Sequence, residues 1–491
     1  MSRLPQSLGR YCSAKDSGAS PATPWTYPPD MTIDVEARFI LDVQAALPGI
    51  RLLTEPADTE GYRFDETPYL TPGRPLGVAF PRSTADVQAI ARLASQHRVP
   101  LVPRGAGSGL SGGAIAVEGG LTVVLTGMDS ILEIDAENLC AVVQPGVINA
   151  DLGRAAAGQA LFYAPDPASF EWCTIGGNLA ENSGGLRCVK YGVTRDAVLG
   201  LEVVLADGAV IRTGGKNVKD VLGYDLSHLF IGSEGTLGII TEATLRLLPL
   251  PPPKLTLLAF FVTVRQAGEA VADITRQGVI PVTLELMDGF TIRAVDSALR
   301  LGLDSEAGAM LMVESDAGGE AAAAELDLVA AACQRAGATS VTRAADAQEA
   351  DWLREARRKA HWSLEQAGVA RMDDVGVPRS RVPEMLAAIE RVAAAHSMRI
   401  GVFGHAGDGN LHPTYILERN DESAEARIDA VRDEIYRAAL ALGGTVTGEH
   451  GTGLAKKRWL ELQRGARAVD VMRSIKKALD PQGLLNPGKV F

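Results

Sequence analysis

Three side chains in the last fifth of the chain have the types and spacing of metal ligands. His405 and His412 lie on either side of a glycine-rich turn, and Glu449 follows in a second glycine-rich segment. Two imidazoles and one carboxylate would bind a divalent metal and leave coordination positions open for a substrate. Zinc suits such a nitrogen and oxygen set best, while the ligand types alone leave manganese and iron(II) open. The alternative is a polar loop whose histidines only cap backbone groups.

A β-hairpin would bring the two histidines together. The apolar runs 398–403 and 411–417 have the character of strands, and the segment 407–410 between them is typical of a turn. Asp408 suits a turn in which the side chain bonds its own backbone. Three of the seven histidines fall in the two glycine-dense segments, which favours chemistry over a purely structural role.

Three further glycine-dense segments, at 104–113, 176–192 and 232–238, could hold a phosphate group. The first contains a literal G-x-G-x-x-G at Gly107, Gly109 and Gly112. A strand rather than a helix is expected after it, which argues against a nicotinamide-binding Rossmann motif. Successive glycine N–H groups can still form an anion nest for a pyrophosphate. A loop without a ligand is a fair alternative for one such segment and a poor one for three.

The elements expected around these segments divide the chain at the proline run 249–253. Before it, we expect helices at 32–47, 84–97 and 149–158 and strands at 78–81, 121–125, 131–134, 141–143, 201–205, 210–212 and 239–247. After it, we expect strands at 255–264, 282–287 and 310–314 and helices at 266–277, 320–336 and 464–479. This alternation predicts an α+β domain with helices against one sheet.

Bulk properties limit the classes of function. The length predicts two or three domains, and the formal net charge of −12 argues against nucleic acid as the main partner. The longest apolar run, 255–264, is too short to span a membrane. Five scattered cysteines without C-x-x-C spacing suit a reducing cytoplasm, so a cytoplasmic location is expected. Residues 1–30 lack a signal-peptide core and are predicted to be disordered, and Met31 could be the biological start.

The glycine-rich segments resemble those of a known flavoprotein family. Residues 104–113, 176–185, 190–192 and 232–238 are similar to the flavin-binding segments of the vanillyl-alcohol-oxidase-type, FAD-linked oxidase family. Residues 405–412, 449–451 and 486–489 resemble its D-2-hydroxyacid dehydrogenase branch. That branch includes glycolate oxidase flavoprotein subunits, D-lactate dehydrogenases and D-2-hydroxyglutarate dehydrogenases. The resemblance covers roughly residues 35–491.

The resemblance implies an α+β fold in three parts after the extension 1–30. These are a two-subdomain PCMH-type FAD-binding domain at 31–250, an α+β substrate-capping domain at 251–445, and a C-terminal helical return at 446–491 that completes the active site. The first glycine segment has no histidine for covalent attachment, so the FAD is expected to be non-covalent. The positions that match the family's flavin contacts are Arg104, Gly105, Ala106, Gly107, Ser108, Gly109, Leu110, Ser111, Pro145, Gly146, Thr174, Gly177, Asn178, Gly184, Gly185, Tyr191, Gly192, Glu234, Gly235, Ile240 and Asn486.

Together the two halves predict the oxidation of a D-2-hydroxyacid to a 2-oxoacid. A flavin accepts a hydride at its N5, and a metal on the three ligands would lower the pKa of the substrate hydroxyl. His450 is the expected general base, with a role in orienting Glu449 as the alternative. Arg357 matches the family's substrate arginine, which suits a carboxylate. Asn410 could bond the substrate or hold the turn.

Substrate and partners are predicted more coarsely. Relatives that act on 2-hydroxyglutarate carry a lysine just before a D-x-x-x-P element, which is 374–378 here. Met372 stands at that position and favours D-lactate or glycolate over a second carboxylate. The alternatives are a D-2-hydroxyglutarate dehydrogenase, and a flavin-using transferase or an electron-transfer subunit of the same fold. The electron acceptor could be a quinone, a cytochrome, an electron-transfer flavoprotein or a partner subunit, and a homodimer is one expectation for the assembly.

Overall fold

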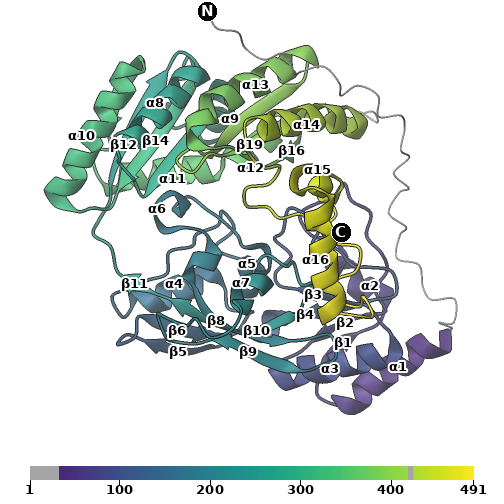
Figure 1. The fold of residues 1–491 in the computed structure, drawn as a ribbon. Helices are drawn as coiled ribbons and strands as arrows, with labels where there is room; N and C mark the ends of the chain where they lie inside the picture. The colour runs from purple at the N-terminus through teal and green to yellow at the C-terminus, as the bar shows by residue number, and fades with distance from the viewer. Residues whose placement is uncertain (1–32, 419–423) are drawn as a thin grey trace, which may run out of the picture.

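The computed structural model describes residues 33–418 and 424–491. The predicted disorder of residues 1–30 and the start at Met31 therefore lie outside the described residues. Figure 1 shows the described chain as two parts stacked on one another, with the carboxyl-terminal segment running alongside both.

A four-stranded sheet begins the amino-terminal part. Its order is β1-β2-β4-β3, and the three strands β2, β4 and β3 run parallel. Helix α3 begins where the Ser83 side chain accepts a hydrogen bond from the Asp86 amide, and it ends at Arg98, which has a left-handed conformation. The elements of this region are α1 (Ile33–Ala46), β1 (Arg51–Leu53), α2 (Pro56–Thr59), β2 (Gly77–Phe80), α3 (Thr84–His97), β3 (Leu101–Arg104) and β4 (Leu121–Val124).

A five-stranded antiparallel sheet follows, in the order β5-β6-β10-β8-β9. A short pair, β7 with β11, closes this part of the chain where the proline run begins. The elements are β5 (Ile131–Asp135), β6 (Cys140–Val143), α4 (Asn149–Ala157), β7 (Leu161–Phe162), α5 (Ile175–Glu181), α6 (Cys188–Tyr191), β8 (Val198–Val204), β9 (Val210–Gly214), α7 (Leu226–Phe230), β10 (Ile239–Arg246) and β11 (Leu248–Pro249).

The remaining strands form one eight-stranded antiparallel sheet, ordered β15-β12-β14-β13-β18-β19-β16, with β17 paired to β19. The strands are β12 (Leu255–Phe261), β13 (Thr283–Asp288), β14 (Ala309–Ser315), β15 (Ala338–Arg343), β16 (Val369–Met372), β17 (Val375–Gly376), β18 (Arg399–His405) and β19 (Asn410–Leu417). The helices are α8 (Val264–Arg276), α9 (Gly289–Leu299), α10 (Gly319–Arg335), α11 (Ala347–Arg358), α12 (Ala360–Gln366), α13 (Val382–Ala395) and α14 (Ala424–Ala441).

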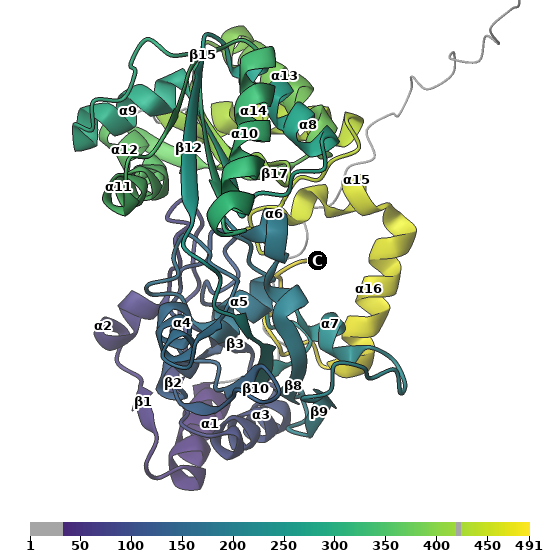
Figure 2. The same ribbon diagram turned by 90° about the vertical axis from the view of Figure 1, so that its left-hand side faces the viewer.

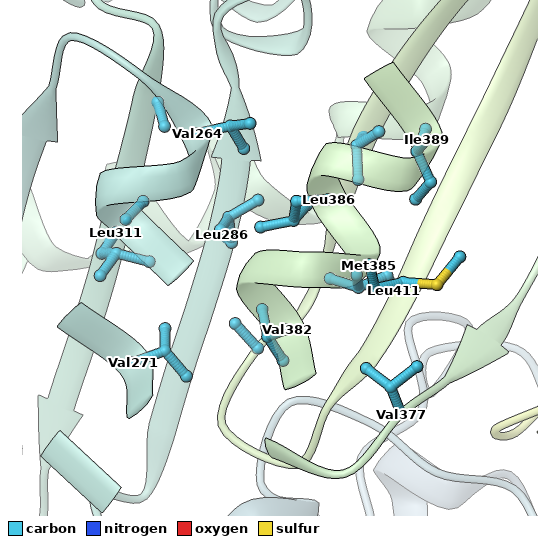
Figure 3. Close-up of a cluster of buried hydrophobic side chains, with 14 of the residues drawn as sticks. Val264, Val271, Leu286, Leu311, Val377, Val382, Met385, Leu386, Ile389 and Leu411 are labelled. Carbon is cyan, nitrogen blue, oxygen red and sulfur yellow. The ribbon is translucent and has the colours of Figure 1, made fainter. Parts of the chain in front are cut away.

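Alternation along the strands explains why helices cover both faces of this sheet. In β12, Leu257 packs in a core with α8, α10, α13 and α14, whereas its neighbour Leu258 packs in a separate core with α9, α11 and α12. Figure 3 shows part of the first core, where Leu286 and Leu311 of the sheet meet Leu386 of α13. The prediction of one sheet covered by helices is confirmed.

Most of the predicted elements are present, with shifts of one to three residues at their ends. The strand predicted over 255–264 is wrong at its end, because β12 stops at Phe261. The Thr263 side chain accepts a hydrogen bond from the Gln266 amide there and starts helix α8 at Val264.

The carboxyl-terminal segment returns from the part with the eight-stranded sheet, called the cap below, to the amino-terminal part, as Figure 2 shows for α15 (Leu460–Arg464) and α16 (Ala466–Leu479). The Lys476 ammonium donates to the carbonyl of Thr236 at 2.7 Å, and the Leu101 amide of β3 donates to the carbonyl of Leu484 at 2.8 Å. None of the described helices is long and apolar enough to cross a bilayer.

Candidate active site

The hairpin of β18 and β19 holds two of the predicted metal ligands. Phe403 of β18 pairs with His412 of β19, so His405 and His412 project from the same face at the mouth of the hairpin. The two ring centroids are 5.2 Å apart. Glu449 reaches in from the carboxyl-terminal segment, with Oε1 at 3.2 Å from Nε2 of His405 and 3.3 Å from Nε2 of His412.

This cluster has the chemistry of a metal site. One ligand atom from each residue lies within 4.8 Å of the others, and no other group of three metal-ligating side chains among residues 33–418 and 424–491 converges in this way. Burial alone would raise the pKa of Glu449, but the two imidazoles outweigh it and hold the pKa well below its usual range. The carboxylate is therefore ionised and ready to bind a divalent cation with the two histidines.

Glu285 of β13 is a partner of the cluster that was not predicted. Its Oε1 lies 2.8 Å from Nδ1 of His405, so Nε2 of that ring is left to face Glu449. Its Oε2 lies 2.6 Å from Nη2 of Arg357. The signal in the sequence is an acidic residue between two leucines in the middle of a strand, a position where a charge needs a specific partner.

Arg357 lies near the end of α11, where it is buried and stacks over the ring of Phe403 at 4.8 Å. Its Nε has no hydrogen-bond partner among the described residues, although the side chain is only 5% exposed. A buried guanidinium with a free donor beside a cavity suits an incoming carboxylate.

Asp374 fixes the loop that carries Glu449 and His450. Its Oδ2 accepts hydrogen bonds from the backbone amides of Gly448 at 2.8 Å and of Glu449 and His450 at 3.0 Å. Burial would raise the pKa of this carboxyl, yet Lys456 and the nearby imidazoles hold the pKa well below its usual range. The D-x-x-x-P element that begins at Asp374 was a signal that could have identified it.

His450 stacks on His412 with ring centroids 5.2 Å apart and an angle of 4° between the planes. Burial lowers the pKa of His450 to about 4, and His412 adds to this against the attraction of Asp374 and Glu449. The imidazole is therefore neutral at physiological pH, as a group that accepts a proton must be.

A cavity of about 690 Å³ lies between the glycine-rich segments of the first part and the cap. His405, His412, Glu449, His450 and Arg357 all line its cap side. Fifteen of the predicted flavin positions line it as well, and they are Arg104, Gly105, Ala106, Gly107, Ser108, Gly109, Leu110, Pro145, Thr174, Gly177, Asn178, Gly184, Glu234, Gly235 and Ile240.

The glycine-rich segments form one wall of the cavity, called the glycine cradle below, and they pack too closely on each other for side chains at some glycines. A Cβ at Gly105 would lie 2.3 Å from Oγ1 of Thr174, and one at Gly176 would lie 2.5 Å from Cβ of Pro145. Glycine is therefore required where these segments meet, and segments with successive glycine N–H groups suit a flavin dinucleotide with its pyrophosphate.

Two family models match the chain, that of an FAD binding domain over residues 75–214 and that of the C-terminal domain of FAD linked oxidases over residues 250–490. A glycolate oxidase subunit of Bacillus subtilis is 47% identical over 431 residues, which cover 88% of this chain and 92% of that protein. The chain belongs to the FAD-linked oxidase family. A D-2-hydroxyglutarate dehydrogenase of Xanthomonas citri is 38% identical over 468 residues, which cover 92% of the oxidase chain and 96% of the relative.

Solved structures agree on the fold of this FAD-linked oxidase. A 4-ethylphenol oxidase from Gulosibacter chungangensis superimposes with a TM-score of 0.77 at 21% identity, covering 95% of this chain and 98% of that one. This likeness agrees with the PCMH-type fold that the sequence predicts, and the family models and the relatives show an FAD-dependent oxidoreductase.

Arg104 lines the cavity, and its guanidinium also supports the glycine loop of the oxidase. Its Nη1 donates to the carbonyl of Phe64 at 2.6 Å, and a Cβ at Gly107, where φ is +81°, would lie 2.0 Å from its Nη2. The loop therefore winds around the guanidinium, and the contact of Arg104 with a pyrophosphate stays a prediction.

Seven other predicted residues of the oxidase do not line the cavity, namely Ser111, Gly146, Gly185, Tyr191, Gly192, Asn486 and Asn410. Tyr191 donates its hydroxyl to Asp316 of the cap at 2.5 Å. Asn486 donates to the carbonyls of Gly113 at 2.9 Å and Glu234 at 2.7 Å, which ties the carboxyl-terminal tail to the glycine segments.

Asn410 holds the hairpin from behind the metal cluster. Its Nδ2 donates to Oδ1 of Asp374 at 2.5 Å and to the carbonyl of Val375 at 3.0 Å. Its backbone amide donates to Oδ1 of Asp408 at 3.2 Å, so Asp408 is the turn residue that was predicted. These hydrogen bonds suit the role in which Asn410 holds the turn, and a hydrogen bond from Asn410 to the substrate stays a prediction.

Proposed function

We propose that this FAD-linked oxidase converts a small D-2-hydroxyacid, D-lactate or glycolate, to the 2-oxoacid with the help of a divalent metal. The observation that carries the proposal is the convergence of His405, His412 and Glu449 with a neutral His450 and a buried Arg357 on one wall of the cavity. The opposite wall is the glycine cradle. A hydroxyacid between these walls would face both cofactors.

Each residue of the cluster has a separate role in the proposed oxidation of the alcohol. When bound, FAD supplies a hydride acceptor and a divalent metal, with zinc best suited to the ligands, supplies Lewis acidity. His405, His412 and Glu449 would hold the metal. The Arg357 guanidinium binds the substrate carboxylate and orients the α-carbon, and an imidazole nitrogen of His450 takes the hydroxyl proton, a step that typically contributes about 10²–10⁴-fold to the rate.

The cavity wall favours a substrate with one carboxylate. Met372 lines the cavity, where it offers an apolar contact. Two further guanidiniums line it but already have partners, since Arg371 pairs with Glu425 at 3.0 Å and Arg358 stacks over Phe170 at 4.8 Å. A second carboxylate, as in D-2-hydroxyglutarate, would compete with Glu425 for Arg371 and would meet the apolar side chain of Met372, so D-2-hydroxyglutarate is the second candidate.

Flavin reduction under anaerobic conditions tests the proposal. We expect D-lactate or glycolate to bleach the visible absorption of the bound flavin, and we expect a chelator to abolish the bleaching. Replacing His405 and His412 by alanine should do the same, whereas His396→Ala, at a half-buried histidine that pairs with Glu434 outside the cavity, should not. Bleaching that survives the chelator and the double substitution would refute the metal mechanism.

A panel of 2-hydroxyacids, with both enantiomers and an artificial dye acceptor, then ranks the substrates. A preference for D-2-hydroxyglutarate over D-lactate and glycolate would move the assignment to the second candidate. The natural acceptor, which we expect to be a quinone, a cytochrome, an electron-transfer flavoprotein or a partner subunit, can be tested in the same assay.

A further inference from the structure

Glu285 is a buried acid that contacts two parts of the site at once. It is 1% exposed, at the third position of β13. Its two oxygens have different partners, Nδ1 of His405 at 2.8 Å and Nη2 of Arg357 at 2.6 Å. One of these partners belongs to the metal cluster, and the other is the guanidinium expected to bind the substrate carboxylate.

The fold of the cap explains how one residue reaches both. Leu284 and Leu286 point into the core under α8, α10, α13 and α14, so Glu285 points to the opposite face, where α11 brings Arg357. The register that pairs Leu286 with Gly404 brings Glu285 beside His405 on the neighbouring strand β18. A buried carboxylate in the middle of a sheet destabilises the fold unless both of its oxygens have polar or charged partners.

We propose that Glu285 is a positioning residue that sets the metal ligand and the substrate arginine with a single carboxylate. The inference deepens the proposed function and rests on it, because it assigns Glu285 a role toward the same metal and carboxylate. Oε1 accepts a hydrogen bond from Nδ1–H of His405 and thereby leaves Nε2 as the ring nitrogen that would bind the cation. Oε2 forms an ion pair with Nη2 of Arg357 at 2.6 Å, without the geometry of a hydrogen bond, and its charge keeps the guanidinium at the cavity wall.

Glu314 shows what a purely structural acid looks like at a comparable place. It lies in the adjacent strand β14, is 0% exposed, and pairs with Arg354 of the same helix α11 and with Lys254 at 3.1 Å. None of these three residues lines the cavity. Glu314 is therefore a matched control for the loss of one buried charge against α11.

Glutamine is the informative replacement because an amide has one acceptor oxygen where a carboxylate has two. If the amide oxygen of Glu285→Gln accepts from His405, the NH₂ group opposes the guanidinium of Arg357. If the oxygen accepts from Arg357, the NH₂ group forces His405 to protonate Nε2 and removes a metal ligand. Either arrangement damages one of the two functions.

The experiment compares E285Q and E314Q with the wild-type holoenzyme. The metal dissociation constant is measured by competition with a chromogenic chelator, in the absence of substrate, and KM and kcat are measured at saturating metal. We expect E285Q either to bind the metal about 10–100-fold more weakly or to raise KM by at least about tenfold, while E314Q stays within about twofold in both quantities. A KM that rises more than kcat falls would point to Arg357, because that residue binds the ground state.

The outcomes separate this inference from the proposed function. Wild-type metal affinity and KM in a folded E285Q protein would overturn the role of Glu285, as would equal losses in E314Q. If E285Q is unchanged but His405→Ala loses metal binding, the proposed metal site still stands and only the role of Glu285 is refuted. Unchanged metal binding in His405→Ala would overturn both. If E285Q does not fold, Glu285→Asp, which keeps both oxygens but has a shorter reach, should show the same losses in weaker form, and its full metal affinity and KM would equally overturn the proposal.

Discussion

Replacing Asp374 by asparagine tests whether the loop of Glu449 and His450 is held in place by one carboxylate. The substitution keeps the size of the side chain and removes its charge. Asp374 is fully buried, and its Oδ2 accepts from three consecutive amides, those of Gly448, Glu449 and His450, within 3.0 Å. The hydroxyl of Thr447 donates to the same oxygen at 2.8 Å.

The size of the effect follows from the change in acceptor. A hydrogen bond to a charged group contributes about 1.5–3 kcal/mol and a neutral one about 0.5–1.5 kcal/mol, so each of the three amide bonds loses about 1 kcal/mol. Their sum of about 3 kcal/mol corresponds to roughly a hundredfold change in the equilibrium that keeps the loop ordered. We expect metal affinity and kcat/KM of D374N to fall by about that factor.

The assay combines chelator competition with steady-state kinetics and amide hydrogen exchange over residues 447–453. Asp373→Asn is the control, because Asp373 accepts from Arg432 at 2.7 Å and from Tyr436 at 2.5 Å and does not bond those amides. We expect D373N to lower the free energy of unfolding by about 3–5 kcal/mol and to leave metal affinity unchanged. A folded D374N protein with metal affinity and kcat/KM within about threefold of wild type would refute this account of the loop.

Three further predictions address the substrate, the flavin and pH. Arg357→Lys removes bidentate binding and should raise KM for D-lactate or glycolate by about tenfold or more, a loss of about 1.4 kcal/mol; an unchanged KM would place the carboxylate elsewhere. Acid precipitation should release yellow FAD into the supernatant, because the first glycine segment has no histidine, and a yellow pellet would show a covalent link. Burial raises the pKa of the Asp288 carboxyl from 3.8 to about 6, so the native state binds this proton more tightly than the unfolded state does. The contribution of Asp288 to the free energy of unfolding therefore falls as the pH rises from about 4 to 6. Asp288→Asn should remove that fall in denaturant titrations at pH 4, 5, 6 and 7, and a fall of the same size in the variant would contradict it.

Local patterns in the sequence were enough to predict the parts of the site that adjacent residues build. The hairpin that carries His405 and His412 follows from two apolar runs around a glycine turn, and the two sides of it pair as expected. The glycine cradle follows from segments that are rich in glycine because side chains would not fit where the segments meet. Both are short-range features, in which spacing along the chain determines position in space.

Residues that act across large sequence distances could not be predicted in the same way. Glu285 contacts His405, which lies 120 positions further along the chain, and Asp374 accepts a hydrogen bond from the amide of Glu449, 75 positions further along. Such partners depend on which strands become neighbours in the sheet. The contact of the Arg104 guanidinium with the carbonyl of Phe64, 40 positions away, is another that the sequence did not indicate.

The carboxyl-terminal segment contacts both walls of the cavity. Glu449, the proposed third metal ligand, lies in this segment, and its backbone amide is held by Asp374 of the cap. Beyond it, Asn486 bonds the glycine segments through Gly113. The segment is thus anchored to the cap on one side of the cavity and to the cradle on the other. A hydride is transferred only between atoms that are nearly in contact. A segment that fixes both walls would therefore set the distance between the α-carbon of the substrate and the flavin. Loosening either anchor should lower kcat before it unfolds the protein.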